Sequence, residues 1–238
     1  MSHVHDTNDS SVKFFQHIID SIKENKPLSF VRYGDGELLC MINLKKGLGG
    51  QNADGDAYLP DLGEALKNSI MHPIKEENFH HGFGAHCTEA GFVRELERQR
   101  IWNFTINFED AFVFIHAGID GRLQKLIELL NQKHSIFVAP KYLHDININF
   151  NKVIEAPTTS AFRDSVRLEQ EIDDALHKSD MSIVILPIGM SAIPVIHSLY
   201  KKHGDKHTFL DFGSPFDAYV KSDVHRSHFD KIQNKLDL

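Results

Sequence analysis

Near the start of the chain, apolar residues recur at helical spacing and are followed by a short β-prone run. The apolar positions are Val12, Phe14, Phe15, Ile18, Ile19 and Ile22. Their period predicts an amphipathic helix behind Ser10 or Ser11, either of which could cap it. After Pro27, residues 28–32 are too few for a helix and predict a strand, which leads into a tight glycine-rich turn at 33–37.

Helical and strand patterns then alternate to the end of the chain. The predicted helices are 38–44, 59–70, 88–98, 122–130, 160–178 and 191–202. The predicted later strands are 135–139, 152–155, 181–186 and 208–211, and each is short and bounded by residues that break regular structure. This alternation predicts an α/β fold, with a mostly parallel sheet covered by helices on both faces.

No internal repeat, low-complexity tract or Pro/Ser-rich linker divides the sequence. We therefore expect residues 1–238 to form a single α/β domain with looser ends at 1–9 and 222–238. The last segment is polar with a few apolar positions, and it could form a helix docked on the domain or on a second subunit, which would make the protein a homo-oligomer.

Composition and charge favour a water-soluble protein that acts on small molecules. The chain has 26 Lys and Arg residues against 33 Asp and Glu residues, a net charge of −7, and 41% hydrophobic residues. A net negative chain has no overall attraction to nucleic acid or anionic lipid, so neither is an expected partner. With no long apolar run and no signal-peptide pattern at the start, we expect no membrane span and a cytoplasmic location.

Candidate chemistry lies just after four of the predicted strands, because ligands of open α/β sheets bind outside the carboxyl ends of the strands. The first such segment runs from Arg32 through Gly34, Asp35 and Gly36 to Glu37. Two carboxylates this close suit Mg²⁺ or Mn²⁺, especially when phosphate oxygens complete the coordination shell. Arg32 could pair with a phosphate or orient a carboxylate. The alternative is an ordinary glycine-rich turn with solvated acids.

The segments after three later strands offer further groups. Gly189, Met190 and Ser191 open a predicted helix, whose free N–H groups and dipole suit a pyrophosphate, although Ser191 could simply cap the helix. Residues 157–161 could supply hydroxyls and amides or cap the following helix. Beyond residue 211, Asp217 is a candidate general base, or else a turn acid. Tyr219 is a candidate ring for stacking on a ligand, or else a core aromatic.

In this order, the segments resemble the glycosyltransferases of the GT-D fold type. That family has a strand ending in Arg-(Phe/Tyr)-Gly-Asp-Gly-Glu with an Asp-x-Glu metal motif, and this chain has Arg-Tyr-Gly-Asp-Gly-Glu at 32–37. The likeness extends to Gln51, to the loop at 157–161 and to the strand-to-helix turn at 188–192, and it covers residues 28–219 as the core.

The resemblance implies a Rossmann-like domain that binds a nucleoside diphosphate sugar, with a UDP-sugar as first choice. Mn²⁺ or Mg²⁺ at Asp35 and Glu37 would assist transfer of the sugar to a hydroxyl of a glycan, protein or small molecule, and Asp217 would act as the base. It also implies substrate contacts from Arg32, Tyr33, Gly34, Gly36, Gln51, Pro157, Ser160, Gly189, Met190, Ser191 and Tyr219.

The chain also departs from the family pattern. The family's last motif resembles Asp-x-Gly-His followed by acids and a Tyr, whereas residues 211–214 read Asp-Phe-Gly-Ser, and Ala218 precedes Tyr219. Thr159 and Ser160 stand where an Asn is usual. Two other functions therefore stay open: a non-catalytic protein that binds nucleotide sugars or acts as a scaffold, and a metal-dependent phosphohydrolase or nucleotidyltransferase using Asp35 and Glu37.

Overall fold

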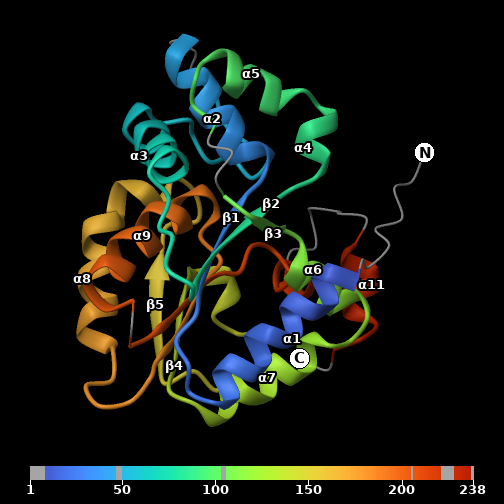
Figure 1. Ribbon diagram of the computed structural model, residues 1–238. Coiled ribbons are helices and arrows are strands. Elements are labelled where there is room, and N and C mark those ends of the chain that lie inside the picture. The colour runs from blue at the N-terminus through green and yellow to red at the C-terminus, as the bar shows by residue number, and fades with distance from the viewer. Residues whose placement is uncertain (1–8, 47–49, 103–105, 205, 221–227, 237–238) are drawn as a thin grey trace.

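The computed structural model describes residues 9–46, 50–102, 106–204, 206–220 and 228–236, and these residues are built on one parallel sheet (Figure 1). Seven strands pair in the order β3-β2-β1-β7-β6-β4-β5, and every pair is parallel. The strands are β1 (Ser29–Tyr33), β2 (Phe79–Phe83), β3 (Phe108–Asp110), β4 (Ser135–Pro140), β5 (Lys152–Ala156), β6 (Ile183–Leu186) and β7 (Thr208–Asp211). The predicted α/β class is confirmed.

Helices cover both faces of the sheet. On one face lie α1 (Asp9–Lys23), α6 (Val113–Ile119), α7 (Leu123–Gln132), α10 (Asp217–Val220) and α11 (Phe229–Gln233). On the other lie α2 (Asp35–Lys46), α3 (Pro60–Met71), α4 (His86–Glu89), α5 (Phe92–Arg98), α8 (Ser165–Ala175) and α9 (Ala192–His203). Short 3₁₀ turns are η1 (Lys141–Leu143), η2 (Ala161–Asp164) and η3 (Gly189–Ser191).

The strands divide the apolar side chains between two cores, because successive side chains of a strand point to opposite faces. Phe30 and Phe137 pack in the core beneath α1 and α7, whereas their neighbours Val31 and Val138 pack in the core beneath α3 and α9. All four side chains are at most 1% exposed. A sheet buried on both faces produces the nearly continuous apolar runs seen in β4 and β6.

Local patterns predicted most elements but not their ends. The first helix begins at Asp9, so the predicted caps Ser10 and Ser11 lie inside it, and Ser11 is buried with its Oγ 3.3 Å from Nδ1 of His116. The predicted helix at 88–98 is divided into α4 and α5 at Gly91, whose φ of +78° breaks the helix. The predicted helix at 160–178 is likewise divided into η2 and α8.

Two strands, β2 and β3, and two helices, α6 and α10, were missed. The sequence of β2 contains two histidines and a glycine, and β3 has three half-buried residues, so neither shows a strong strand pattern. Tertiary pairing stabilises both, since β2 lies between β1 and β3. Helix α6 was missed because its residues are apolar nearly all round, without the polar face that marks an amphipathic helix.

The carboxyl-terminal segment docks on the domain. In α11 and just after it, Phe229, Ile232 and Leu236 are at most 4% exposed and belong to the core beneath α1 and α7. Ile232 packs so close to Gly118 of α6 that a Cβ there would come within 3.1 Å of it. Of the two docking surfaces considered for this segment, the described residues occupy the one on the domain itself. Among described helices, none is long and apolar enough to cross a membrane.

Two buried histidines pack among aromatic rings on the face covered by α3 and α9. His81 of β2 and His197 of α9 have ring centroids 6.2 Å apart, and both contact Phe79. Burial lowers the pKa of both imidazoles, that of His197 to about 3. On the opposite face burial lowers the pKa of His80 to about 4. These side chains are therefore neutral in the folded protein at neutral pH.

Replacing Ile232 by Ala should destabilise the protein by about 2–3 kcal/mol, because it removes a fully buried side chain from the contact with α6. Urea unfolding at pH 7 would measure this. Lys231→Ala, on the exposed side of the same helix, is the matched control and should change stability by less than about 0.5 kcal/mol. Equal stability of the two variants would mean that α11 is not docked in solution.

The free energy of unfolding should fall as the pH drops from 7 toward 4. A histidine whose folded pKa is depressed is protonated first in the unfolded chain, so stability is lost below the unfolded pKa of about 6.5 and on through the folded value. In His197→Gln the loss between pH 7 and pH 5 should be smaller by up to about 2 kcal/mol. Exposed His72→Gln should leave the slope unchanged, and an unchanged slope in His197→Gln would refute the assignment.

Candidate functional site at the carboxyl edge of the sheet

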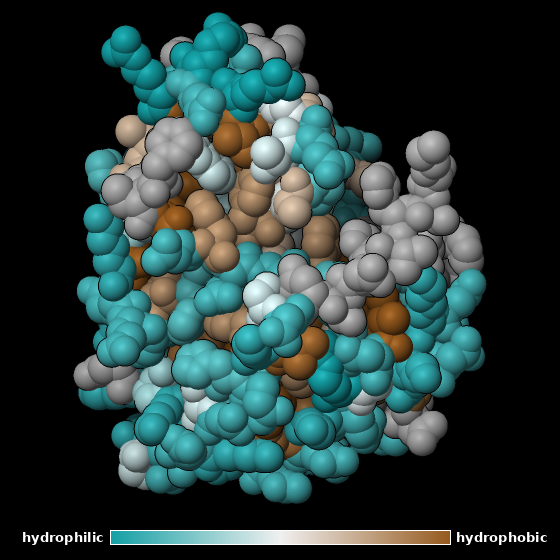
Figure 2. All heavy atoms as spheres, turned by 45° about the vertical axis from the view of Figure 1, so that its right-hand side comes forward, coloured by the Kyte–Doolittle hydropathy of each residue, from teal (hydrophilic) through white to brown (hydrophobic). Residues whose placement is uncertain are grey.

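A pocket opens at the carboxyl ends of the strands, beside the point where the chain changes direction across the sheet. Strands β1, β2 and β3 extend one way from the centre, and β7, β6, β4 and β5 the other, so the ends of β1 and β7 flank this point. The pocket has a volume of about 250 Å³. Figure 2 shows one face of the molecule as largely hydrophilic, with apolar side chains gathered in the hollowed upper middle of the view.

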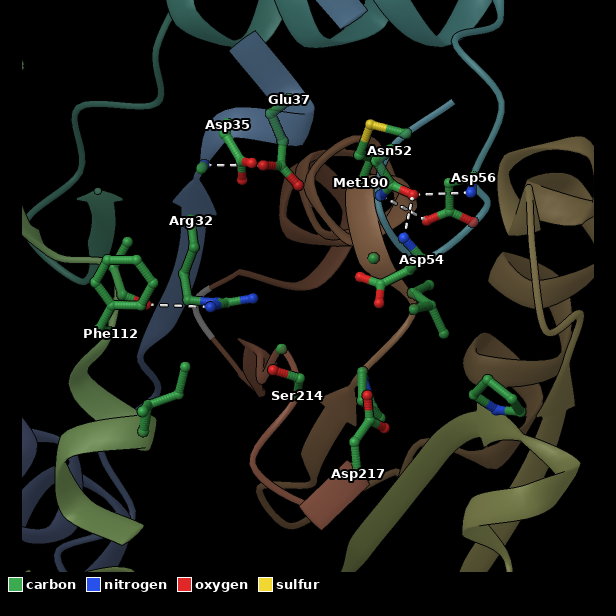
Figure 3. A pocket seen from close by; sticks show the side chains of 18 of the residues that line it. Arg32, Asp35, Glu37, Asn52, Asp54, Asp56, Phe112, Met190, Ser214 and Asp217 are labelled. Atoms are coloured by element: carbon green, nitrogen blue, oxygen red, sulfur yellow. Dashed lines mark hydrogen bonds between the residues drawn. The ribbon is translucent and has the colours of Figure 1, made fainter. Parts of the chain in front are cut away.

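The pocket brings together groups from all four segments that the sequence singled out (Figure 3). The predicted site residues that line it are Arg32, Gly34, Asp35, Glu37, Pro157, Gly189, Met190 and Asp217. In the close-up, Asp35 and Glu37 lie at one end and Asp217 lies across the cavity from them. The predicted convergence of these strand ends therefore agrees with the structure.

The other predicted substrate contacts do not line the pocket. Tyr33 is fully buried, and its hydroxyl lies 2.9 Å from Oγ of Ser69. The hydroxyl of Tyr219 donates to the carbonyl of Ile232 at 3.2 Å, so this ring holds α11 rather than facing the cavity. Four more predicted contacts also lie outside the lining. Gly36 packs against Asn52 and Met190, and Gln51 forms a β-bridge with Ala57. The backbone N–H of Ser160 donates to Asp56, and Ser191 is buried.

Asp35 and Glu37 both lie in the first turn of α2. Strand β1 ends at Tyr33 and the helix begins at Asp35, so the turn predicted over 33–37 consists of Gly34 alone. Asp35 is exposed, and its carboxylate makes no hydrogen bond or ion pair within the described residues. Oε2 of Glu37 accepts the backbone N–H of Gly34 at 2.8 Å. One carboxylate is thus open to the cavity, and the other is held in place by the strand-to-helix turn.

The side chain of Glu37 titrates close to neutral pH. Burial and the negative charge of Asp211 raise its pKa to about 7, while the Gly34 N–H and Arg32 act in the opposite direction. A carboxyl group of this kind loses its proton readily when a cation binds next to it.

Arg32 and Asp211 form a buried ion pair under the pocket. Nη2 of Arg32 lies 3.0 Å from Oδ1 of Asp211, whose side chain is 2% exposed. The Arg32 side chain also donates to the backbone carbonyls of Asp211 and Ala111, at 3.0 and 3.1 Å. Gly213 has φ +68°, and a Cβ there would lie 2.3 Å from Nη2 of Arg32, so only glycine fits. Arg32 therefore orients a carboxylate, the second of its two predicted roles.

A loop over residues 50–58 forms the roof of the pocket and is held by Asp56. Oδ1 of Asp56 accepts the backbone N–H of Ser160 at 2.7 Å, and its backbone N–H donates to Oδ1 of Asn52 at 2.8 Å. Its other carboxylate oxygen lies against Gly189, where a Cβ would come within 2.4 Å. A carboxylate of the chain itself therefore sits beside the glycine turn that was predicted to receive a pyrophosphate.

Several lining residues were not predicted. Those outside the predicted segments are Asn52, Asp54, Asp56, His86, Ala111, Phe112, Ile115, Pro140, Tyr142 and His228, whereas Thr158, Pro187, Ile188, Gly213 and Ser214 belong to segments that the sequence singled out. The alternating polar residues at 52–56 were a usable signal for the roof loop. Phe112 and Ile115 follow β3 and could not be placed, because that strand was not predicted. Tyr142 is linked to the predicted residue Asp217, because its hydroxyl donates a hydrogen bond to Oδ1 of Asp217 at 3.1 Å.

The pocket is rich in negative charge. Among the described residues, five carboxylate residues line it, Asp35, Glu37, Asp54, Asp56 and Asp217, and the one arginine, Arg32, is already paired with Asp211. An anionic ligand would meet net repulsion here unless a cation entered with it. Among the described residues no group of three or more His, Cys, Asp or Glu side chains could hold a metal. Asp35 and Glu37 would thus supply two oxygen ligands, and the bound molecule or water would supply the rest.

Comparison with solved structures assigns the fold. A structure described as "The highly conserved domain of unknown function 1792 has a distinct glycosyltransferase fold" matches with a TM-score of 0.62, over 92% of this chain and 87% of that chain. The chain has a glycosyltransferase-like fold. Sequence identity across the match is 16%, so the likeness concerns the fold alone. No protein-family model and no curated protein matches the chain.

Asp211→Asn should destabilise the protein by about 3 kcal/mol, because it leaves the Arg32 guanidinium without its buried counter-charge. Urea unfolding at pH 7 would measure the change. The control is Asp9→Asn, which breaks an exposed pair with Lys13 and should cost less than about 0.5 kcal/mol. A loss no larger than that of the control would show that the ion pair is not needed for the fold.

Proposed function

We propose that the protein is a metal-dependent glycosyltransferase, which moves a sugar from a nucleoside diphosphate sugar, first of all a UDP-sugar, to an acceptor hydroxyl. The observation that carries the proposal is the placement of Asp35 and Glu37 together in a pocket at the carboxyl edge of a glycosyltransferase-like fold. Both carboxylates of the Asp-x-Glu pattern lie on the cavity, as donor binding through a cation requires.

The donor set fits a hard divalent cation such as Mn²⁺ or Mg²⁺. Both side chains offer oxygen ligands, and the Asp35 carboxylate has no other partner within the described residues. When bound, the cation would neutralise the charge that develops on the leaving diphosphate. Because the Glu37 pKa is about 7, a proton competes with the cation, and this carboxylate serves best as a ligand above neutral pH.

Asp217 is the proposed general base. It lies across the cavity from Asp35 and Glu37, where it would face an acceptor positioned on the far side of the donor sugar (Figure 3). The Tyr142 hydroxyl donates to Oδ1 of Asp217 and holds the carboxylate in place. In the proposed reaction the bond from the sugar to the diphosphate breaks, the acceptor oxygen bonds to the sugar carbon, and Asp217 takes the hydroxyl proton.

The turn before α9 and residues 157–158 supply the remaining parts of the proposed donor site. Gly189 and Met190 line the cavity where the chain enters η3, and backbone amides there would contact the diphosphate. Pro157 and Thr158 form the adjacent wall. The acceptor is proposed to be a hydroxyl of a glycan, a protein or a small molecule. A cytoplasmic location and a homo-oligomeric state stay predictions.

Calorimetric titration of UDP and a panel of UDP-sugars, with Mn²⁺ and with a chelator, tests the proposal. We expect binding that requires metal and that weakens by about tenfold or more in Asp35→Asn/Glu37→Gln. Glu76→Gln/Glu77→Gln removes two neighbouring acids from an exposed turn and should bind as the wild type does. Transfer would then be followed by release of nucleoside diphosphate with candidate acceptors.

Other results would favour a different function or refute the proposal. Release of free phosphate or pyrophosphate would favour the phosphohydrolase or nucleotidyltransferase alternative, which uses the same carboxylates. Metal-dependent binding without any turnover in an acceptor screen would favour a nucleotide-sugar binding protein. If UDP compounds and other nucleoside diphosphates fail to bind, or bind equally well to the double variant, the glycosyltransferase assignment is wrong.

A further inference from the structure

A second cavity lies at the opposite, amino edge of the sheet. Its lining comes from the segments that precede five strands, 25–27 before β1, 131–134 before β4, 149–151 before β5, 177–181 before β6 and 206–207 before β7. These strands are neighbours in the sheet, so their leading loops meet at one edge. The resulting groove has a volume of about 1000 Å³, and we call it the amino-edge groove.

The charge of the amino-edge groove is opposite to that of the chain. Lys133, Lys178 and Lys206 line it, and among the described residues Asp180 is the one carboxylate residue in the lining, although the whole chain carries −7. The amines of Lys178 and Lys206 make no hydrogen bond or ion pair with any described residue. The amine of Lys133 donates to Oδ1 of Asn25 at 2.7 Å. The described lining therefore has three lysines against one carboxylate residue, an excess of positive charge.

Two asparagines of the groove have their acceptor atoms already used. Oδ1 of Asn131 accepts the backbone N–H of Asn149 at 2.7 Å, and Oδ1 of Asn151 accepts that of Ser135 at 2.8 Å. A backbone N–H can only donate, so these contacts fix which way each amide faces. Both NH₂ groups lack a partner in the part of the chain that the structure describes. Each side chain thus retains two unused donors.

Two of the histidines that line the groove, His177 and His207, also accept a hydrogen bond from the backbone. Nδ1 of His177 accepts the backbone N–H of Asp180 at 3.1 Å, and Nδ1 of His207 accepts that of Ser182 at 3.1 Å. The proton of each neutral imidazole is consequently on Nε2. Four side chains of the lining, Asn131, Asn151, His177 and His207, therefore use an acceptor atom on the protein's own backbone, while donors of Lys178, Lys206, Asn131 and Asn151 remain unused within the described residues.

We propose that the amino-edge groove binds an oxyanion, the phosphate group of a phosphorylated small molecule. A surplus of hydrogen-bond donors together with positive charge is complementary to a group that has several acceptor oxygens and negative charge. The groove is larger than a single phosphate, which leaves room for the molecule that carries it. This site is separate from the carboxyl-edge pocket, and it requires no metal because its own side chains supply the positive charge.

Calorimetric titration with inorganic phosphate, glycerol phosphate and tripolyphosphate, in the presence of a chelator, tests the proposal. Lys178→Gln/Lys206→Gln should weaken binding by about tenfold or more. The matched control, Lys75→Gln/Lys231→Gln, removes two exposed lysines elsewhere and should bind as the wild type does. In nuclear magnetic resonance spectra, the side-chain NH₂ signals of Asn131 and Asn151 should shift and saturate with the same dissociation constant.

The proposal is overturned if no phosphate compound gives saturable binding, or if both lysine pairs weaken binding equally, because either result would indicate unspecific charge attraction. Tighter binding of a single-stranded oligonucleotide than of tripolyphosphate would also overturn it, in favour of an extended polyanion surface. Asp35→Asn/Glu37→Gln separates this proposal from the glycosyltransferase assignment. Groove binding should be unchanged in that variant, so either proposal can fail without the other.

Discussion

The ion pair between Arg32 and Asp211 is the contact on which the geometry of the carboxyl edge depends. It joins the ends of β1 and β7, where the strand order changes direction, and a further hydrogen bond from Arg32 reaches the carbonyl of Ala111 beyond β3. One guanidinium thus ties together three separate segments of the edge. A buried charge of this kind is stable only with its partner, which is why Gly213 must leave room for it.

The same pair determines the electrostatics of the pocket. Since Asp211 pairs with Arg32, no arginine of the described lining compensates the charge of the pocket's carboxylates. Asp211 also raises the pKa of Glu37, so the stability of the strand ends and the acidity of a proposed metal ligand depend on one buried group. At the other edge of the sheet lysines outnumber acids. The net charge of −7 conceals this separation of charge between the two edges.

Elements with a strong local pattern were predictable, and those stabilised by tertiary pairing were not. The strands β4, β6 and β7 are short, mainly apolar runs, and β5 is centred on Val153 and Ile154. Residues that break regular structure lie close to their ends, so all four could be recognised without knowing their neighbours. By contrast, β2 and β3 depend on pairing with β1 and with each other. Phe112, which follows β3, could not be assigned to the pocket for the same reason.

The sequence by itself determined the α/β class, the strand-to-helix turn that carries Asp35 and Glu37, and the clustering of candidate groups after strands, because these follow from local periodicity and chain order. Only the tertiary structure decided that Arg32 binds Asp211, that Asp56 holds the roof loop to the loop residue Ser160 before α8, and that Tyr33 and Tyr219 face away from the cavity. Those outcomes depend on which distant segments meet, and no local pattern encodes such contacts.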